Sequence, residues 1–344
     1  MPERGFGSAV VLGDGGWGTT LALCLVENGL RVTLWSPFVL QAEELRARRE
    51  NTRYLPGIAL PPELRITADP IAACEEAELA VSVVPTQYLR KVARQFEDAL
   101  KGDVPLVSAT KGLEIETFRR PSEILAEELG ERPLCVLSGP SHAEEVARRQ
   151  PASLVAASTD ARLAERVQSS LGGERLRVYT HTDPVGAELG AALKNVIAIA
   201  AGISDGLGLG DNAKAALVTR GAVEMARFGK QHGAQAGTFF GLAGLGDLIT
   251  TCTSRHSRNR AVGERIGAGE TLEQVLESME MVAEGVWTTQ ALFGPESEQR
   301  GGEMPIAEQV YQVLFDGKDP RAAVEDLMRR EPSSEMEGLL PTLS

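Results

Sequence analysis

The chain has 344 residues, of which 43% are hydrophobic, so it is long enough for two domains that each bury a core. Its 35 basic and 48 acidic side chains give a net charge of −13, which disfavours sequence-independent binding to nucleic acid or to an anionic membrane. No apolar run approaches membrane-spanning length and the first residues do not resemble a signal peptide, so we expect a cytoplasmic protein without a membrane anchor.

The first motif is a glycine-rich turn between a strand and a helix. Apolar residues 9–12 predict a short buried strand, which leads into Gly13, Gly15 and Gly18 with the spacing G-x-G-x-x-G. In a dinucleotide-binding turn these glycines permit the tight turn, the approach of a pyrophosphate and close packing of the helix on the sheet. The N–H groups at the helix start would then bind the anion. We predict such a site here, provided that the Asp14 carboxylate points away or is solvated.

Strands and helices then alternate along the first half of the chain. Strands are expected at 31–35, 79–84, 106–109, 134–137, 153–157 and 176–179, and helices at 41–49, 89–100, 122–129 and 161–171. Residues 51–57 and the pair Pro61-Pro62 are expected to form a loop. This alternation is typical of a parallel sheet with helices on both faces, whose ligands bind beyond the carboxyl ends of the strands.

The pattern changes near residue 183. Long helical patterns at 185–201 and 212–227 follow, without a convincing strand. We therefore predict an α/β Rossmann-type doubly wound domain over 1–182, an all-helical domain over 183–330, and a tail over 331–344.

One cation, Lys194, lies within the small and apolar residues 186–202. A lysine in such surroundings is costly unless its charge is paired or its pKa is lowered by burial. A lysine that extends to water at a domain surface would explain the same pattern. Because Asn195 adjoins it and glycines lie on the helix faces that a cofactor could approach, we favour a functional role for Lys194.

A second polar cluster follows the glycine-rich turn at 241–247. Hydroxyl, amide and guanidinium groups gather between Thr250 and Arg260 at a predicted helix start, a combination that suits a phosphate ester better than a neutral ligand. For Arg255 and Arg260 we prefer a solvated helix face.

The cysteines and histidines show no spacing typical of metal ligands. No C-x-x-C pair and no H-x-x-x-H pattern occurs, so we predict free thiols and no metal site. The residues concerned are Cys24, Cys74, Cys135 and Cys252, with His142, His181, His232 and His256.

Eight motifs, taken together, resemble soluble glycerol-3-phosphate dehydrogenase of the bacterial type. They occur in order between residue 8 and about residue 320, at 13–19, 51–57, 109–114, 138–141, 193–196, 244–248, 252–259 and 282–285. The resemblance implies a Rossmann domain followed by a helical domain, with the active site in the cleft between them. We also expect a homodimer.

The resemblance assigns roles residue by residue. It makes Lys194 the catalytic proton acceptor. Further cofactor contacts would be Gly16, Trp17, Ala143, Val282 and Glu284, and substrate contacts would be Gly139, Ser141, Lys194, Asp247, Ser257 and Asn259, with Lys111 and Arg258 contacting both.

The implied reaction converts sn-glycerol 3-phosphate and dihydroxyacetone phosphate into one another, with NAD or NADP as cofactor, for glycerophospholipid synthesis. A base removes the hydroxyl proton as hydride leaves for the nicotinamide, and the same group returns the proton in the reverse direction. Burial and Lys111 would lower the pKa of Lys194, whereas Asp247 and the substrate phosphate would raise it.

Two alternative functions stay open at this point. A related 3-hydroxyacid or sugar-acid dehydrogenase would use the same Lys194-Asn195 pair but would need a carboxylate site in place of Ser257, Arg258 and Asn259. A non-catalytic dinucleotide-sensing protein would need neither Lys194 nor the phosphate site.

The end of the second strand bears on the choice of cofactor. NAD-selective Rossmann folds carry an acid there that binds the ribose hydroxyls. Here the strand ends at 34–38, and the first carboxylate after it is Glu43, while Pro37 stands where the family often has histidine or arginine. We therefore predict that NADP is accepted at least as well as NAD, without strong selectivity.

Overall fold

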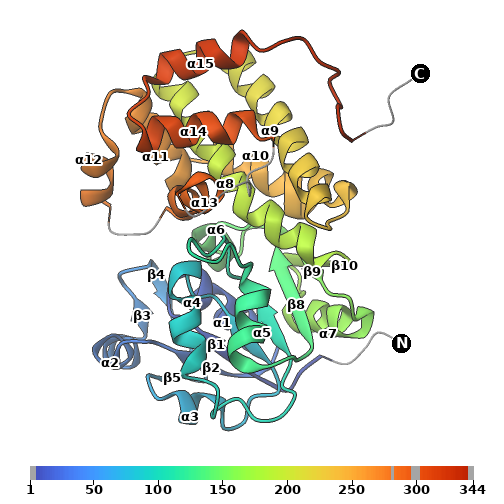
Figure 1. Cartoon of the computed structure of the whole chain (residues 1–344). Helices are drawn as coiled ribbons and strands as arrows, with labels where there is room; N and C mark the ends of the chain where they lie inside the picture. The colour runs from blue at the N-terminus through green and yellow to red at the C-terminus, as the bar shows by residue number, and fades with distance from the viewer. Residues whose placement is uncertain (1–4, 280–282, 296–302, 340–344) are drawn as a thin grey trace. The chain divides into compact units, whose positions relative to one another are not determined.

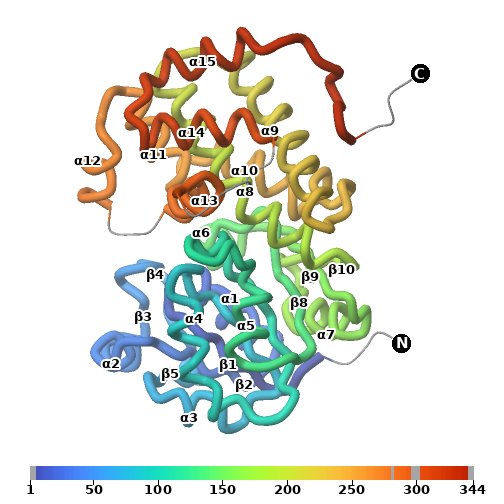
Figure 2. The backbone as a smooth tube through the Cα atoms, in the orientation of Figure 1, coloured from blue at the N-terminus to red at the C-terminus, as the bar shows by residue number. Residues whose placement is uncertain are grey.

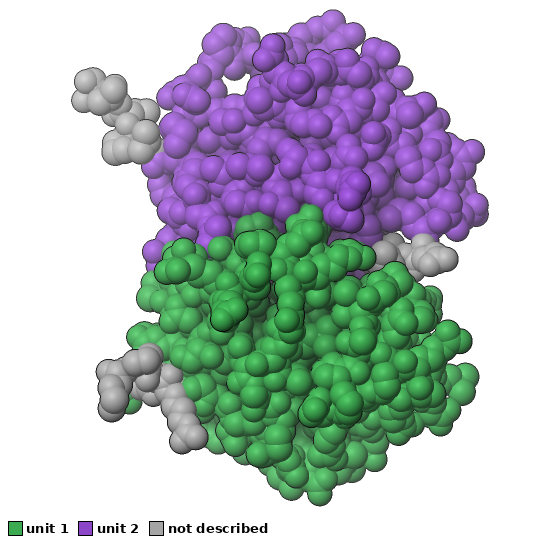
Figure 3. Space-filling view, turned by 180° about the vertical axis from the view of Figure 1, so that it is seen from behind, with its two compact units in different colours: residues 1–110, 121–184 green, residues 111–120, 185–344 purple. Residues whose placement is uncertain are grey.

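The computed structural model describes residues 5–279, 283–295 and 303–339 (Figure 1). The chain divides into two compact units, coloured separately in Figure 3. Unit 1 comprises residues 1–110 and 121–184, and unit 2 comprises residues 111–120 and 185–344.

Unit 1 is built on an eight-stranded sheet with the order β10-β9-β8-β7-β6-β1-β2-β5. Because β1 has β2 on one side and β6 on the other, the strand order reverses at β1, and ligands bind at such a reversal in folds of this class. The strands are β1 (Ser8–Leu12), β2 (Arg31–Trp35), β5 (Arg65–Thr67), β6 (Ala80–Ser82), β7 (Leu106–Ser108), β8 (Leu134–Ser138), β9 (Ala152–Ala157) and β10 (Leu176–His181).

Helices cover both faces of this sheet. Alternate residues of β1 belong to different apolar clusters, Val11 to one and Val10 to the other, as expected of a strand buried on both sides. Helices α1, α2 and α7 pack into the first cluster and α3, α4 and α5 into the second, which confirms the predicted doubly wound α/β domain. The helices are α1 (Gly16–Glu27), α2 (Val39–Arg48), α3 (Pro70–Cys74), α4 (Thr86–Arg94), α5 (Pro121–Leu129), α6 (Ala143–Ala147) and α7 (Ala161–Leu171).

We expected a wholly parallel sheet, but one pair of neighbouring strands is antiparallel. Strand β9 pairs antiparallel with β8, whereas the other described pairs of this sheet are parallel. The connection from β8 to β9 contains the five-residue helix α6, whereas the connection between the parallel strands β7 and β8 contains the nine-residue helix α5.

The segment expected as a loop at 51–57 contains regular structure. Strands β3 (Glu50–Asn51) and β4 (Leu55–Ala59) form a two-stranded antiparallel sheet. The prediction failed because β3 is only two residues long, and Pro56 and Gly57 within β4 are residues typical of turns.

The regular secondary structure of unit 2 is all helical among the described residues, as predicted (Figure 2). Its helices are α8 (Pro184–Gly206), α9 (Asp211–Gln231), α10 (Asp247–Thr253), α11 (Arg258–Gly267), α12 (Leu272–Glu277), α13 (Glu284–Phe293), α14 (Pro305–Phe315) and α15 (Pro320–Met328). A 3-10 turn (Ala236–Phe240) and a π-helical turn (Leu242–Gly246) connect α9 to α10.

Helix α8 forms the centre of unit 2. It is the one helix among the described residues that is long and apolar enough to cross a membrane, with a mean hydropathy of 1.3, and 94% of that stretch is buried inside the structure. The sequence shows no uninterrupted apolar run here, because Glu188 and Lys194 interrupt it. Both side chains are buried and paired, Glu188 with Arg120 and Lys194 with Asp247.

The domain division expected at residue 182 differs in one segment, since residues 111–120 belong to unit 2. Leu113 packs into the core of the helical unit. Lys111 Nζ lies 3.0 Å from Asp247 Oδ2, and Arg120 Nη1 lies 2.6 Å from Glu188 Oε2. These contacts are long-range in sequence, so no local pattern indicates that the chain enters the second unit here and leaves it again.

The described part of the predicted tail contacts α9. The Arg220 guanidinium donates to the Glu335 carbonyl, and Lys230 Nζ donates to the Gly338 carbonyl at 3.2 Å.

Candidate active site

The glycine turn after β1 has the geometry that a pyrophosphate requires. Gly13 has φ +114°, a conformation that favours glycine, and a Cβ on Gly18 would lie 2.0 Å from the Gly13 carbonyl oxygen. Nothing lies within 4 Å of the position a Cβ would take on Gly15, so the backbone is open to a ligand there. Helix α1 begins at Gly16, without a side-chain hydrogen bond to its cap. These residues fit a dinucleotide bound at the start of α1.

Asn51 fixes this turn from the small sheet. Its side chain is fully buried, and Nδ2 donates to the Asp14 carbonyl at 2.7 Å and to Thr19 Oγ1 at 2.8 Å. Sequence analysis gave Asn51 no role because it lay in an expected loop. Its one signal was its place at the start of the family motif at 51–57.

Three further predicted cofactor residues gather at the start of α1. A Cβ on Gly16 would lie 3.6 Å from the Ala143 Cβ, and Thr20 Oγ1 donates to the Ala143 carbonyl at 3.2 Å. Trp17 is partly buried against the apolar cluster of that sheet face. The structure thus brings Gly16, Trp17 and Ala143 to the glycine turn.

The turn after β8 carries Gly139 and Ser141. Gly139 has φ +130°, and Ser141 Oγ donates to the Gly139 carbonyl at 3.0 Å. Strands β1, β6, β7 and β8 run parallel, so this turn and the glycine turn after β1 lie at the same carboxyl edge of the sheet.

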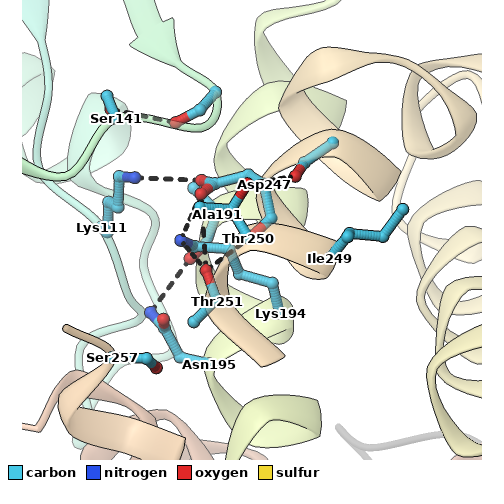
Figure 4. A network of polar contacts seen from close by, with 12 residues as sticks. Lys111, Ser141, Ala191, Lys194, Asn195, Asp247, Ile249, Thr250, Thr251 and Ser257 are labelled. Carbon is cyan, nitrogen blue, oxygen red and sulfur yellow. Dashed lines mark hydrogen bonds and ion pairs between the residues drawn. The ribbon is translucent and has the colours of Figure 1, made fainter. Parts of the chain in front are cut away.

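A network of charged side chains lies in unit 2 (Figure 4). Lys194 Nζ is 2.6 Å from Asp247 Oδ1 and donates to Thr251 Oγ1 at 2.8 Å. Lys111 Nζ is 3.0 Å from the other carboxylate oxygen of Asp247. Lys194 and Asp247 are buried, at 5% and 2% exposure, so two ammonium groups share one buried carboxylate.

Close packing of the backbone positions this network. A Cβ on Gly190 of α8 would lie 2.6 Å from the Ala243 carbonyl, so the π-helical turn packs directly on α8. Lys194 lies one helical turn after Gly190, and Asp247 lies four residues after Ala243. Asp247 and Thr251 are spaced i, i+4 on α10, which places both side chains on one face. Our sequence analysis did not assign a role to Thr251, although this spacing was a usable signal.

Helices α8, α11 and α13 meet around Gly285. A Cβ there would lie 2.6 Å from the Asn195 carbonyl, and the Gly285 N–H donates to Asn259 Oδ1 at 2.9 Å. Asn195 Nδ2 donates to the Ala191 carbonyl at 3.1 Å. Glu284, a predicted cofactor contact, is the first residue of α13 and therefore adjoins this meeting point.

The predicted phosphate ligands lie at the start of α11. Ser257 caps the helix, since its Oγ accepts from the Arg260 N–H at 3.2 Å. Arg258 is the first helical residue and is exposed. The expectation of a solvated Arg260 is wrong, because Nη1 of this half-buried residue lies 2.7 Å from Asp205 Oδ2. Arg255 is exposed as expected.

Comparison with known proteins identifies the family. The model for the NAD-dependent glycerol-3-phosphate dehydrogenase N-terminus matches residues 8–164, and the model for its C-terminus matches residues 183–325. This chain belongs to the NAD-dependent glycerol-3-phosphate dehydrogenase family.

Individual relatives agree over nearly the full length. The glycerol-3-phosphate dehydrogenase (NAD(P)+) of Chlorobium phaeobacteroides is 48% identical over 329 residues, which cover 95% of this chain and 98% of that protein. The protein of the same name from Geobacillus thermodenitrificans is 49% identical over 334 residues, covering 96% of this chain and 97% of the relative. A crystal structure of glycerol-3-phosphate dehydrogenase from Coxiella burnetii matches with a TM-score of 0.89 at 38% identity, covering 94% and 99% of the two chains.

The electrostatics of the lysine network suit a dehydrogenase of this family. Burial lowers the pKa of Lys194 to about 8, with the nearby Lys111 charge acting in the same direction and Asp247 opposing both. Burial would raise the pKa of Asp247, but Lys111 and Lys194 together hold it below its usual value. These interactions bring the pKa of Lys194 closer to neutral pH than that of an exposed lysine and keep Asp247 ionised.

Two remaining predictions concern residues or groups outside this network. Val282, a predicted cofactor contact of the dehydrogenase, lies outside the described residues. Among the residues that the structure does describe, no group of three or more His, Cys, Asp or Glu side chains could hold a metal ion.

Proposed function

We propose that this dehydrogenase catalyses reversible hydride transfer between NAD(P)H and dihydroxyacetone phosphate, giving sn-glycerol 3-phosphate for glycerophospholipid synthesis. The observation that carries the proposal is the buried Lys194, whose pKa of about 8 lies close to a neutral operating pH. A general acid or base is most effective when its pKa lies near that pH.

The bound nicotinamide supplies the hydride in one direction and accepts it in the other. For reduction, Lys194 in its ammonium form donates a proton to the oxygen of the substrate carbonyl as the carbon receives the hydride. For oxidation, neutral Lys194 takes the hydroxyl proton. Asp247 holds the Lys194 amine at 2.6 Å and balances its charge when it is protonated.

The phosphate of the substrate is assigned to the start of α11. Arg258 supplies a fork of N–H donors, and the helix terminus adds its dipole. Lys111 adds a second positive charge. Because Lys111 and Lys194 share the single carboxylate of Asp247, these three side chains together carry a net positive charge. Binding energy from the phosphate, remote from the reacting carbon, orients the carbonyl.

The test is a spectrophotometric assay of NADH and NADPH oxidation with the purified protein. We expect turnover with dihydroxyacetone phosphate and none with dihydroxyacetone plus inorganic phosphate at equal concentration, because the phosphate must be attached to orient the carbonyl. A 2-oxo or 3-oxo acid serves as the second comparison. Faster turnover of the oxo acid would mean that the α11 site binds a carboxylate and that the assignment of substrate is wrong.

The proposal includes a homodimer in the cytoplasm. The four cysteines are free thiols in the structure, which suits a reducing compartment. Sedimentation equilibrium over a range of protein concentrations measures the oligomeric state directly, and a monomer mass throughout would exclude the dimer.

A further inference from the structure

The glycine turn and the end of β2 are held side by side. The strand register pairs Leu12 with Trp35, and the Gly13 N–H continues the ladder by donating to the Trp35 carbonyl at 3.0 Å. The next residues along the two segments are Asp14 and Ser36, and both are buried, at 5% and 0% exposure. Asp14 therefore lies at the end of β2 although it comes from the turn after β1.

The Asp14 backbone is fixed, whereas its carboxylate is incompletely satisfied. Asn51 Nδ2 and Thr19 Oγ1 both donate to the Asp14 carbonyl, at 2.7 and 3.2 Å. Within the described structure, Asp14 Oδ2 is buried and has no hydrogen-bond partner. The neighbouring Ser36 hydroxyl donates to the Phe38 carbonyl and accepts from the Phe38 N–H, both at 3.2 Å, and it also lies close enough to Asp14 to lower the pKa of that carboxyl.

This environment is costly for an ionised carboxylate. Burial raises the pKa of Asp14, and the nearby Ser36 hydroxyl and Arg53 charge only partly oppose that rise. A buried acceptor without a hydrogen-bond partner is stabilised most by a ligand that supplies hydroxyl donors. In our sequence analysis the turn could bind phosphate only if Asp14 pointed away or was solvated; the structure shows it buried next to Ser36.

We propose that Asp14 is the specificity-determining residue that selects NAD(H) over NADP(H) in this chain. In Rossmann folds the adenosine ribose lies at the end of the second strand, where an acid accepts hydrogen bonds from its hydroxyls. Here β2 ends without an acid, and the Asp14 carboxylate occupies that place from the glycine turn. A 2′-phosphate would remove the donor and bring a second negative charge against a buried one.

This inference rests on the proposed function and reverses our expectation of equal or better use of NADP, which considered only the residues that follow β2. The Arg53 charge lowers the pKa of Asp14 from the neighbouring segment, and Arg53 itself is exposed, with its guanidinium carbon 5.0 Å from the centre of the Tyr54 ring. Once the Asp14 charge is removed, Arg53 becomes a cation available to a 2′-phosphate.

Direct binding tests the inference without turnover. We would titrate NADH and NADPH by nicotinamide fluorescence, and ADP-ribose and its 2′-phosphate by calorimetry. We expect the wild type to prefer the form without the 2′-phosphate by at least about tenfold, and Asp14→Asn to reduce this ratio by about tenfold or more. Adding Arg53→Ala to Asp14→Asn should weaken NADPH binding again. Glu43→Gln, which removes an exposed charge on α2, should leave the ratio unchanged.

Each outcome either supports or overturns the inference about Asp14. Equal wild-type affinity for ADP-ribose and its 2′-phosphate overturns the inference whether or not any variant folds. An unchanged ratio in a folded Asp14→Asn protein overturns it as well. If neither nucleotide binds the wild type at all, the proposed function fails with it, whereas binding of both with equal affinity leaves the proposed function intact.

Discussion

The glycine turn of unit 1 and the lysine network of unit 2 offer different chemical groups to their ligands. The turn uses main-chain groups within residues 13–18, and its specificity comes from the absence of side chains at Gly15 and Gly18. The network uses side chains from three separate segments, at Lys111, Lys194 and Asp247.

This difference determines which changes each region tolerates. In the turn, the course of the backbone decides whether a pyrophosphate can bind, so a single added methyl group at Gly15 or Gly18 is decisive, and the Asp14 charge acts only on the choice between the two cofactors. In the network, the balance of charge is the function, because two buried or half-buried ammonium groups share one carboxylate. Removing one charged group there changes the protonation of the others.

The largest effect is expected at Lys194. Lys194→Ala should lower kcat by about 100-fold to 10,000-fold, because it removes the general acid and base. Lys194→Arg should be nearly as inactive, since a guanidinium does not release its proton near neutral pH. NADH binding, measured by fluorescence titration, should stay within about threefold of wild type. Near-normal kcat in either variant would remove Lys194 from the mechanism.

The second and third glycines of the G-x-G-x-x-G pattern, Gly15 and Gly18, separate cofactor binding from folding. Gly18→Ala should lower the free energy of unfolding by about 3 kcal/mol, because the new Cβ meets the Gly13 carbonyl, a backbone atom that does not move easily. Gly15→Ala should change stability by less than about 0.5 kcal/mol, since the position has φ −62° and open space around it. The same variant should nevertheless bind NADH at least about tenfold more weakly.

Urea unfolding of both variants, together with titration of NADH, checks this pair. Unchanged NADH affinity in Gly15→Ala would show that the pyrophosphate does not approach this part of the turn.

The turn could be predicted from sequence because its physical causes are local. Gly13, Gly15 and Gly18 follow directly on a buried strand, and the required conformations belong to consecutive residues. Most strand positions could be predicted for the same reason, but the short strands β3, β4 and β5 could not. The antiparallel direction of β9 could not be predicted either, because it depends on how the strand packs beside β8 and not on its own residues.

The lysine network could be predicted only in part. Lys194 stood out as a cation in an apolar helix, but its partners are 53 and 57 residues away, at Asp247 and Thr251. Lys111 reaches Asp247 because its segment crosses into unit 2, which no local pattern indicates. The Asp14 carboxylate was recognised as awkward, but its place beside Ser36 follows from strand register and not from its own neighbours.

A smaller effect is expected at the start of α11. Arg258→Ala should raise the KM for dihydroxyacetone phosphate by roughly 10-fold to 100-fold, because a charge-assisted hydrogen bond to the phosphate is lost. Arg258→Lys should recover only part of that loss, because a single ammonium does not replace the two-pronged guanidinium. Arg255→Ala is the matched control, since Arg255 is also exposed and lies three residues earlier. If Arg255→Ala raises KM as much as Arg258→Ala does, the effect is general electrostatic attraction and not a specific contact.

The smallest effect is expected at Thr251, and its signature is a shift in pH dependence. Reduction of dihydroxyacetone phosphate needs protonated Lys194, so kcat/KM should fall as pH rises through about 8, while oxidation of glycerol 3-phosphate should rise over the same range. Thr251 Oγ1 accepts a hydrogen bond from the ammonium form of Lys194 and thereby stabilises it. Thr251→Val removes that bond, so the pKa of Lys194 should fall by up to about one unit and both profiles should move to lower pH. Thr250→Val is the control, because the Thr250 hydroxyl donates to the carbonyl of Gly246, the last residue of the preceding π-helical turn, and not to Lys194 or Asp247. A lower rate in Thr251→Val without any displacement of the profile would mean that Thr251 supports the packing of α10 and not the protonation of Lys194.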